Sequence, residues 1–338
     1  MTRCLDCGQR TADGRHSCPA PAPLPEVPGY RVERLLGRGG FATVVAALGP
    51  DGSRVALKIA SAGDAIAAEQ LANEEAALRE VGPPVVPAVL GAGRAGESPW
   101  LALELLELPT LGDRLDEGGG ALSRGEFASR AAALIDAAAA VHAKGYAHLD
   151  LKPENVFLAP SIARLIDFGL ARRLSETRAP RGFAGTAEYA SPEQCEERSE
   201  LDERADLYAI GVMLYEMLAG RPPFTGAPND VRQAHAGLRP QRPSAFAPVT
   251  PAIEQVVLRC LAKDRARRYQ TARELRVALD QALAASDPGR TPAPVDPAAA
   301  ARPKLERRQA GLLFFASGAD AGSVQAAVRT VGGELVFA

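Results

Sequence analysis

The sequence predicts an α+β fold with two lobes, a small β-rich N-terminal lobe and a mostly helical C-terminal lobe. Two patterns carry this prediction. The first part of the central region alternates apolar and polar side chains in short runs separated by turn residues, whereas the pattern after Ser123 repeats at helical spacing. Strands followed by helices predict two lobes with a crevice between them.

The expected elements follow in chain order. Alternation predicts a strand over 30–36, and Pro50-Asp51-Gly52 predicts a hairpin between the runs 43–48 and 54–59. Leu71 and Leu78 lie at helical spacing and predict a helix over 65–81. A strand is expected over 100–106, and the helices expected in the larger lobe cover 123–144, 204–219, 251–261 and 271–284.

Composition divides the chain into four parts. Residues 1–26 carry cysteines and end in a proline run, which is typical of a stiff spacer. Residues 27–284 are the expected folded domain, whose lobes meet at about residues 106 and 107. An Ala/Pro-rich linker is expected over 285–304, followed by a tail over 305–338.

The tail has a strand–helix–strand pattern of unknown role, with apolar runs at 311–317 and 334–338 around a helical pattern at 320–331. A unit this small buries too little surface to be stable alone. We therefore expect it to dock on the folded domain, to pair with a partner chain or to be a truncated remnant.

Charge and hydropathy exclude several classes of function. The 338 residues include 39 Lys+Arg and 41 Asp+Glu, a formal net charge of −2, which argues against nucleic acid or a membrane surface as the main partner. No apolar run approaches the roughly 18 residues of a membrane span, and the N-terminus lacks the apolar core of a signal peptide. The expected location is cytoplasmic.

The first motif with chemical meaning is Gly37-Arg38-Gly39-Gly40, which lies between two predicted strands. Glycines let the backbone approach phosphates and present N–H groups to them. The strand–turn–strand context argues against a Rossmann or Walker loop, which would precede a helix. The motif therefore predicts a β-flap over phosphates, with a plain glycine-rich hairpin as the alternative.

The second motif is Lys58, which stands among apolar residues on the next strand. Such a lysine can simply face solvent, but behind a phosphate flap it could neutralise phosphates if a carboxylate held it. The helix over 65–81 offers Glu74 or Glu75. We prefer Glu74 because it shares a helical face with Leu78.

The third and fourth motifs place polar side chains beside apolar runs. Asp150, Lys152 and Asn155 lie close together in sequence, and Asp167 follows the apolar pair 165–166 and precedes Phe168-Gly169. Asp can deprotonate a hydroxyl, Lys can neutralise a phosphate, and Asn and Asp oxygens can ligate a hard cation. A polar turn without chemistry is the alternative for the first group.

Together these motifs resemble a eukaryotic-type (Hanks-type) serine/threonine protein kinase of the bacterial kind. Their order and spacing match over about residues 30–284, and Gly185–Glu193 resembles the family's substrate-docking segment. Ala42 stands where the family has a third glycine. The resemblance implies a protein-kinase-like two-lobed fold and transfer of the γ-phosphoryl group of ATP to Ser/Thr hydroxyls of proteins in cytosolic signalling.

The resemblance also implies a role for individual residues. Asp150 would accept the proton of the substrate hydroxyl, and Lys152 would stabilise the transferring group. Asn155 and Asp167 would bind Mg²⁺ or Mn²⁺. The implied ATP-binding residues are Leu36, Gly37, Gly39, Ala42, Val44, Ala56, Lys58, Glu74, Glu104, Leu106 and Phe157, with Leu103 guarding the deep pocket; the docking and structural residues are Thr186, Glu193, Asp206 and Arg268.

Two other functions compete with an active protein kinase. A pseudokinase or scaffold would bind nucleotide with little catalysis, and the presence of every catalytic residue argues against it. A small-molecule kinase of related fold would need no peptide-docking segment, so residues 185–193 argue against that reading.

Leu149 departs from the family pattern, in which an arginine before the catalytic Asp grips a phosphate on the activation loop. Leucine cannot do this, so activity is expected not to depend strongly on phosphorylation of the loop 167–193. Activation through another cationic cluster is the alternative. The loop carries Arg172, Arg173, Arg178 and Arg181, for which plain solvated charge is the simpler reading.

The N-terminal cysteines form a hypothetical zinc site. Cys4 and Cys7 are spaced as a C-x-x-C hook followed by a glycine, Cys18 is a third ligand, and His16 is the available fourth. The spacing of His16 and Cys18 is less usual than a second C-x-x-C. A disordered, reduced segment is the alternative.

Overall fold

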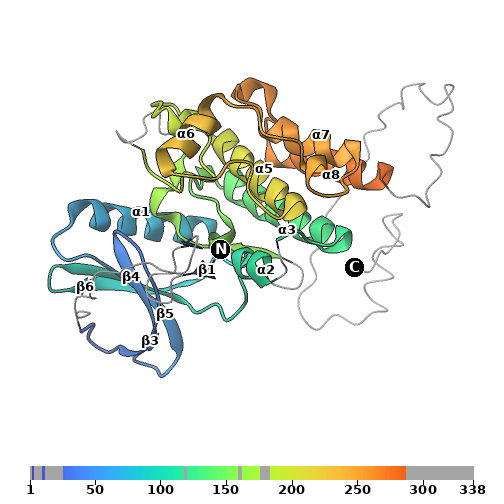
Figure 1. Ribbon diagram of the computed structural model, residues 1–338. Helices are drawn as coiled ribbons and strands as arrows, with labels where there is room; N and C mark the ends of the chain where they lie inside the picture. The colour runs from blue at the N-terminus through green and yellow to red at the C-terminus, as the bar shows by residue number, and fades with distance from the viewer. Residues whose placement is uncertain are drawn as a thin grey trace, which may run out of the picture. The chain divides into compact units, whose positions relative to one another are not determined.

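The computed structural model describes residues 2–3, 10–11, 26–117, 120–158, 162–175 and 183–286 (Figure 1). The chain divides into two compact units, Met1–Thr291 and Pro292–Ala338. Every described residue belongs to the first unit. All but the first two residues of the expected linker, and the whole tail over 305–338, lie outside the described residues.

The N-terminal lobe is built on one antiparallel five-stranded sheet with the order β3-β4-β5-β7-β6 (Figure 1). Its strands are β3 (Arg31–Arg38), β4 (Ala42–Leu48), β5 (Arg54–Ala60), β6 (Val89–Ala95) and β7 (Ser98–Glu104). Pro50-Asp51-Gly52 closes the β4–β5 hairpin, as predicted from these turn residues. Strand β6 was not predicted, because its two glycines and Arg94 obscure the alternation.

Alternation along β5 separates the two faces of this sheet. Val55, Leu57 and Ile59 pack into a small core on one face, so Ala56 and Lys58 must point to the other face. That second face is covered by the helix α1 (Ala65–Val81), which has the predicted bounds. The side chain of Asp64 accepts hydrogen bonds from the first turn of α1 and caps its N-terminus.

The C-terminal lobe is mostly helical, which confirms the predicted α+β division. Helix α5 (Glu203–Ala219) is buried along nearly its whole length, as the centre of this lobe. At Gly211 an added Cβ would lie 2.4 Å from Cβ of Cys260, so glycine lets the helix α7 (Pro251–Cys260) pack closely. The other helices are α2 (Leu111–Glu117), α3 (Arg124–Ala143), α4 (Pro192–Cys195), α6 (Pro228–Gly237) and α8 (Ala272–Ala285).

Short strands flank the loops that carry Asp150 and Asp167. β8 (Tyr146–Ala147) pairs with β11 (Arg172–Arg173), and β9 (Val156–Leu158) pairs with β10 (Ala163–Leu165). Near the N-terminus, β1 (Thr2–Arg3) pairs with β2 (Arg10–Thr11). Among the described residues, no helix is both long and apolar enough to span a membrane.

Candidate active site

Lys58 connects the two lobes through two carboxylates. Its Nζ lies 2.5 Å from Oε2 of Glu74 on α1 and 2.7 Å from Oδ1 of Asp167 in the C-terminal lobe. Burial would lower the pKa of Lys58, but the charges of Asp167 and Glu74 outweigh it and raise the pKa. Lys58 therefore stays a cation. The neighbouring Glu75 pairs with Arg79 instead, which resolves the choice between the two glutamates.

Lys58 holds the side chain of Asp167 in place and keeps it ionised. Asp167 lies in the left-handed backbone region, with φ 67°, at the start of the short 3₁₀ turn η2 (Phe168–Leu170). The charge of Lys58 lowers the pKa of Asp167 to about 2. The side chain is thus a carboxylate, with Oδ1 bound to Lys58.

A buried aspartate on α5 holds the backbone before Asp150. Asp206 Oδ2 accepts the N–H of His148 and Oδ1 accepts the N–H of Leu149, each at 2.7 Å. His142 Nε2 lies 2.9 Å from Oδ2. Burial would raise the pKa of Asp206, but these hydrogen bonds lower it. Asp206 is therefore a fixed anion that orients the loop.

The carboxylate of Asp150 faces both Lys152 and Thr186. Its Oδ1 accepts the N–H of Thr186 at 3.0 Å and the hydroxyl of Thr186 at 3.1 Å, while Oδ2 lies 3.2 Å from Lys152 Nζ. Lys152 also donates to the Thr186 hydroxyl at 3.0 Å. Burial raises the pKa of Asp150 above its usual range, which makes the carboxylate a better proton acceptor.

Asn155 lies between Asp150 and the strand that leads to Asp167. Its Nδ2 donates to the backbone oxygen of Asp150 at 2.9 Å, and its own backbone oxygen accepts the N–H of Ile166. These bonds fix the amide so that Oδ1 is left as a possible ligand. A carbonyl oxygen and a carboxylate oxygen form the donor set that Mg²⁺ prefers, so Asn155 and Asp167 fit this cation.

The ring of His148 connects the loop that carries Asp150 to the segment that leads to Asp167, a role that was not predicted from the sequence. Nε2 lies 2.9 Å from the carbonyl oxygen of Ile166, so Nε2 carries the hydrogen, and Nδ1 accepts the N–H of Asp150. The ring also packs on Phe168, with the centroids 4.5 Å apart. The positions of Asp150 and Asp167 are thereby coupled through one side chain.

An apolar surface lies on the sheet face that carries Lys58. Val44 and Ala56 occupy this face of β4 and β5, and Leu103 pairs with Ala56 from β7. Phe157 lies on β9 and bridges to Thr110. Leu36 is 37% exposed at the bulge of β3, and Leu103 is 8% exposed. These side chains are apolar, and Lys58 lies on the same sheet face as Val44 and Ala56.

The glycine-rich turn between β3 and β4 is closed by one backbone bond. Gly37 pairs with Val44, and the N–H of Gly39 donates to the carbonyl oxygen of Ala42 at 2.9 Å. An added Cβ at Gly37 would meet no atom within 4 Å. The structure does not itself require glycine there, which is consistent with a demand for close approach by a ligand.

The side chain of Glu104, at the end of β7, is held in an ion pair with Arg164. Both oxygens pair with the guanidinium of Arg164 on β10 at 2.6 Å, and Oε2 accepts the N–H of Ala88. Arg164 was not predicted as part of the site, since a lone arginine carries no signal for this pairing. Leu106 is half-buried in the segment that follows β7.

Residues 30–278 match the protein kinase domain family. The chain belongs to the protein kinase family. The match spans the glycine-rich turn, Lys58, Asp150 and Asp167.

Named relatives confirm the resemblance to bacterial Hanks-type kinases. The chain is 37% identical over 322 residues to the serine/threonine-protein kinase Pkn2 of Myxococcus xanthus, and the match covers 87% of the chain and 37% of the relative. It is 36% identical over 273 residues to Pkn1 of the same organism, with 75% and 38% covered. It is 38% identical over 211 residues to PknB of Mycolicibacterium smegmatis, with 58% and 33% covered. The chain therefore spans less than half the length of these relatives.

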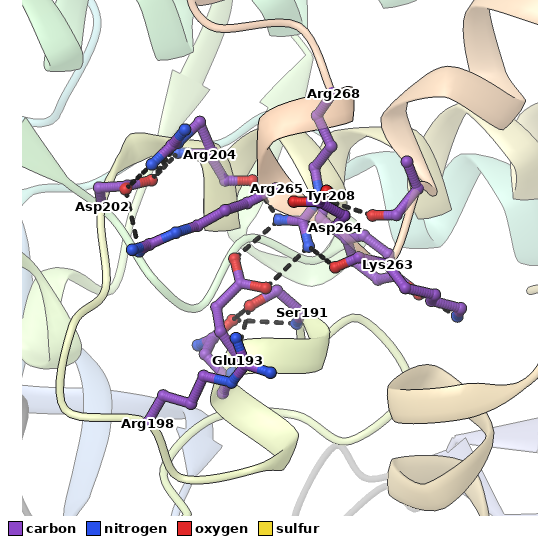
Figure 2. A network of polar contacts seen from close by, with 12 residues as sticks. Ser191, Glu193, Arg198, Asp202, Arg204, Tyr208, Lys263, Asp264, Arg265 and Arg268 are labelled. Carbon is purple, nitrogen blue, oxygen red and sulfur yellow. Dashed lines mark hydrogen bonds and ion pairs between the residues drawn. The ribbon is translucent and has the colours of Figure 1, made fainter.

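A buried ion pair holds Glu193, the last residue of the predicted docking segment (Figure 2). Arg268 has no exposed surface and binds both oxygens of Glu193 at 2.7 Å. Its other N–H groups donate to the backbone oxygens of Ala262, Arg204 and Lys263. Every guanidinium donor thus has an acceptor, which is what a buried arginine requires.

Some residues singled out in the sequence lie outside the described part of the chain. Cys4, Cys7, His16 and Cys18 lie outside the described residues, as do Arg178 and Arg181. Arg173 forms an ion pair with Glu80 and stacks on Tyr146, so it is not a merely solvated charge.

Proposed function

We propose that the chain is a serine/threonine protein kinase that transfers the γ-phosphoryl group of ATP to Ser/Thr hydroxyls of protein substrates. The observation that carries the proposal is Asp150, a half-buried carboxylate bridged by Lys152 and Thr186. A hydroxyl in the place of the Thr186 hydroxyl would meet a base and a cation together. No observation among the described residues favours a pseudokinase or a small-molecule kinase.

In this proposal each residue has one task. Asp150 takes the proton of the substrate hydroxyl, and Lys152 stabilises negative charge beside it. Asn155 and Asp167 hold Mg²⁺ or Mn²⁺, which would neutralise charge on the ATP phosphates. Lys58, kept in place by Glu74, aligns the phosphates under the glycine-rich turn at Gly37, Gly39 and Ala42. Leu36, Val44, Ala56 and Phe157 enclose adenine, and the backbone at Glu104 and Leu106 hydrogen-bonds its edge.

The docking residues complete the proposed domain of residues 27–284. Thr186 marks where the acceptor lies, while Glu193, Asp206 and Arg268 hold the surrounding loops. We propose a cytoplasmic location, since ATP is a cytosolic substrate and Cys195 and Cys260, the cysteines among the described residues, are free. We further propose that the tail over 305–338 associates with another chain.

The test replaces the two charged centres separately. Asp150→Asn and Lys58→Met are each expected to lower phosphoryl transfer by about 100-fold or more, because a positioned base alone contributes about that much. ATP binding should survive Asp150→Asn, which leaves the nucleotide contacts in place. The measurement uses labelled ATP with Mg²⁺ or Mn²⁺ and a generic protein acceptor, with a separate ATP-binding titration.

Glu75→Gln is the matched control, because Glu75 lies on the same helix but pairs with Arg79. It should keep wild-type turnover. Undiminished turnover in Asp150→Asn or Lys58→Met would contradict the assignment of the site.

We also propose a zinc site made by Cys4, Cys7, His16 and Cys18. Strands β1 and β2 pair Thr2 with Thr11 and so bracket the segment that carries the first two cysteines. Thiolate and imidazole are the ligands that Zn²⁺ prefers.

Metal analysis of the full chain under reducing conditions tests this site. We expect one zinc per chain, lost in the double substitution Cys4→Ser/Cys7→Ser and retained in Cys195→Ser, whose thiol is buried in the larger lobe. A wild-type chain without stoichiometric zinc would refute the proposal.

A further inference from the structure

Residues 183–188, which overlap the start of the docking segment Gly185–Glu193, are held on two sides, by Asp150 and by helix α6. Thr186 is bound to Asp150 on one side, as described above. On the other side, the guanidinium carbon of Arg232 lies 4.2 Å from the ring centroid of Phe183. His235 Nε2 lies 2.9 Å from the carbonyl oxygen of Glu188. Residues 183–188 are thus contacted at both ends by side chains of one helix.

Arg232 is itself fixed in position. Its Nη2 donates to the backbone oxygen of Cys195 and to Glu197, each at 2.9 Å. Its Nε is buried and has no hydrogen-bond partner among the described residues. A guanidinium lying over an aromatic face is a stable arrangement for such a group, so Phe183 supplies what a hydrogen bond does not.

His235 lies three residues after Arg232, which places both on one face of α6. The carbonyl of Glu188 can only accept, so Nε2 carries the hydrogen. Nδ1 must then accept from the hydroxyl of Tyr208, 2.8 Å away. Lys263 Nζ donates to the same hydroxyl oxygen at 3.1 Å and to the backbone oxygen of His235 at 2.7 Å. The hydrogen bonds therefore run in one direction, from Lys263 through Tyr208 and His235 to the carbonyl oxygen of Glu188. Figure 2 shows Tyr208 and Lys263 beside Arg268.

We propose that Arg232 and His235 are positioning residues that hold segment 183–188 in its substrate-docking conformation without a phosphate on the activation loop. The inference rests on the proposed kinase function and concerns its regulation. Leu149 provides no cation for such a phosphate, and α6 supplies the restraint from the opposite side. The peptide substrate meets a surface set by packing on α6, which also contacts α4 at the end of the docking segment.

The first test measures coupling between Phe183 and Arg232 in the full chain. Phe183→Leu and Arg232→Met are each expected to lower kcat/KM at least fivefold, about 1 kcal/mol of barrier. The acceptor is one Ser-containing peptide selected on the wild-type enzyme. The KM for ATP should change less than twofold. The double variant should be no worse than either single variant, and Phe183→Tyr should keep wild-type kinetics because it keeps the ring.

The matched control is a second stacked pair in the same lobe. Arg221 lies 5.4 Å from the ring centroid of Phe246, and Phe246 is 41% exposed. Arg221→Met and Phe246→Leu should leave kcat/KM unchanged. Additive losses in the Phe183/Arg232 double variant, or an equal change in the KM for ATP, would overturn the proposal.

A second measurement does not need catalysis. Hydrogen exchange at the Thr186 amide should be slowed by its bond to Asp150 in the wild type. Exchange should accelerate at least fivefold in Arg232→Met and His235→Leu, but not in Arg221→Met. Unchanged exchange would overturn the positioning role even if the wild type phosphorylates no protein. Accelerated exchange in an inactive wild-type chain would support the role and refute only the kinase proposal.

Discussion

At the scale of single residues, the backbone and the side chain of Leu149 have different roles. Its N–H donates to Asp206 and its carbonyl oxygen accepts from Gln194 at 2.8 Å, with φ 64°. Its side chain is buried in a small apolar cluster with Ala147 and Ala205. The loop keeps its shape through backbone bonds, while the side chain has an apolar environment in which a charged group would be unfavourable.

We expect from this that activity does not depend strongly on activation-loop phosphorylation. A phosphate there would find no cation at position 149 to couple it to Asp150. Phosphatase-treated and untreated enzyme should have similar activity. Thr177→Ala, which removes a hydroxyl of the loop 167–193, should resemble both.

A loss beyond about tenfold after phosphatase treatment, which is about 1.4 kcal/mol of barrier, would contradict this independence. Such a loss would indicate another cationic cluster as the phosphate receptor.

At the scale of elements, α6 depends on a histidine that stays neutral. Burial, and then the nearby charge of Lys263, lower the pKa of His235 to about 4. A protonated Nδ1 could no longer accept the hydroxyl of Tyr208. The hydrogen bonds through which His235 links α6 to residues 183–188 are therefore complete only where the imidazole is neutral.

This predicts a loss of stability on acidification. The unfolded histidine binds its proton near its ordinary pKa of about 6.5, whereas the folded one binds near 4. Between these values the unfolded state binds more protons, so stability falls as the pH falls through this window. Urea unfolding from pH 7 to 4.5 should show the wild type losing on the order of 2 kcal/mol more than His235→Gln.

Parallel pH dependences for the two proteins would refute this linkage. His235→Gln is suitable because its side chain is uncharged in both states and retains an N–H donor for Glu188.

At the scale of the whole molecule, the catalytic parts all lie within residues 36–193, and the larger lobe supports them up to α8. Helix α8 ends at Ala285, and the expected Ala/Pro-rich linker over 285–304 separates the tail in sequence from the catalytic residues. Deletion of residues 286–338 should therefore preserve kinase activity. It should change self-association or substrate choice if the tail binds another chain.

The measurement compares turnover and molecular mass in solution for the 1–285 chain and the full chain. A folded 1–285 chain without activity would show that the tail belongs to the working enzyme and that the proposed domain boundary is wrong.

The sequence alone determined the fold class and predicted the Lys58–Glu74 pair, because local spacing carries that information. Helix α1 has the predicted bounds, and the choice of Glu74 over Glu75 followed from helical periodicity. Burial of one helical face is a local pattern, so it can be read without coordinates. The same holds for the close sequence spacing of Asp150 and Asn155.

Only the tertiary structure decided the pairings between distant residues. Glu104 with Arg164, and Arg232 with Phe183, join positions far apart in the chain. A lone arginine or histidine carries no periodic signal, because its partner is chosen by how helices and loops pack. The tautomer of His235 likewise depends on which groups surround it after folding, and no stretch of sequence contains that information.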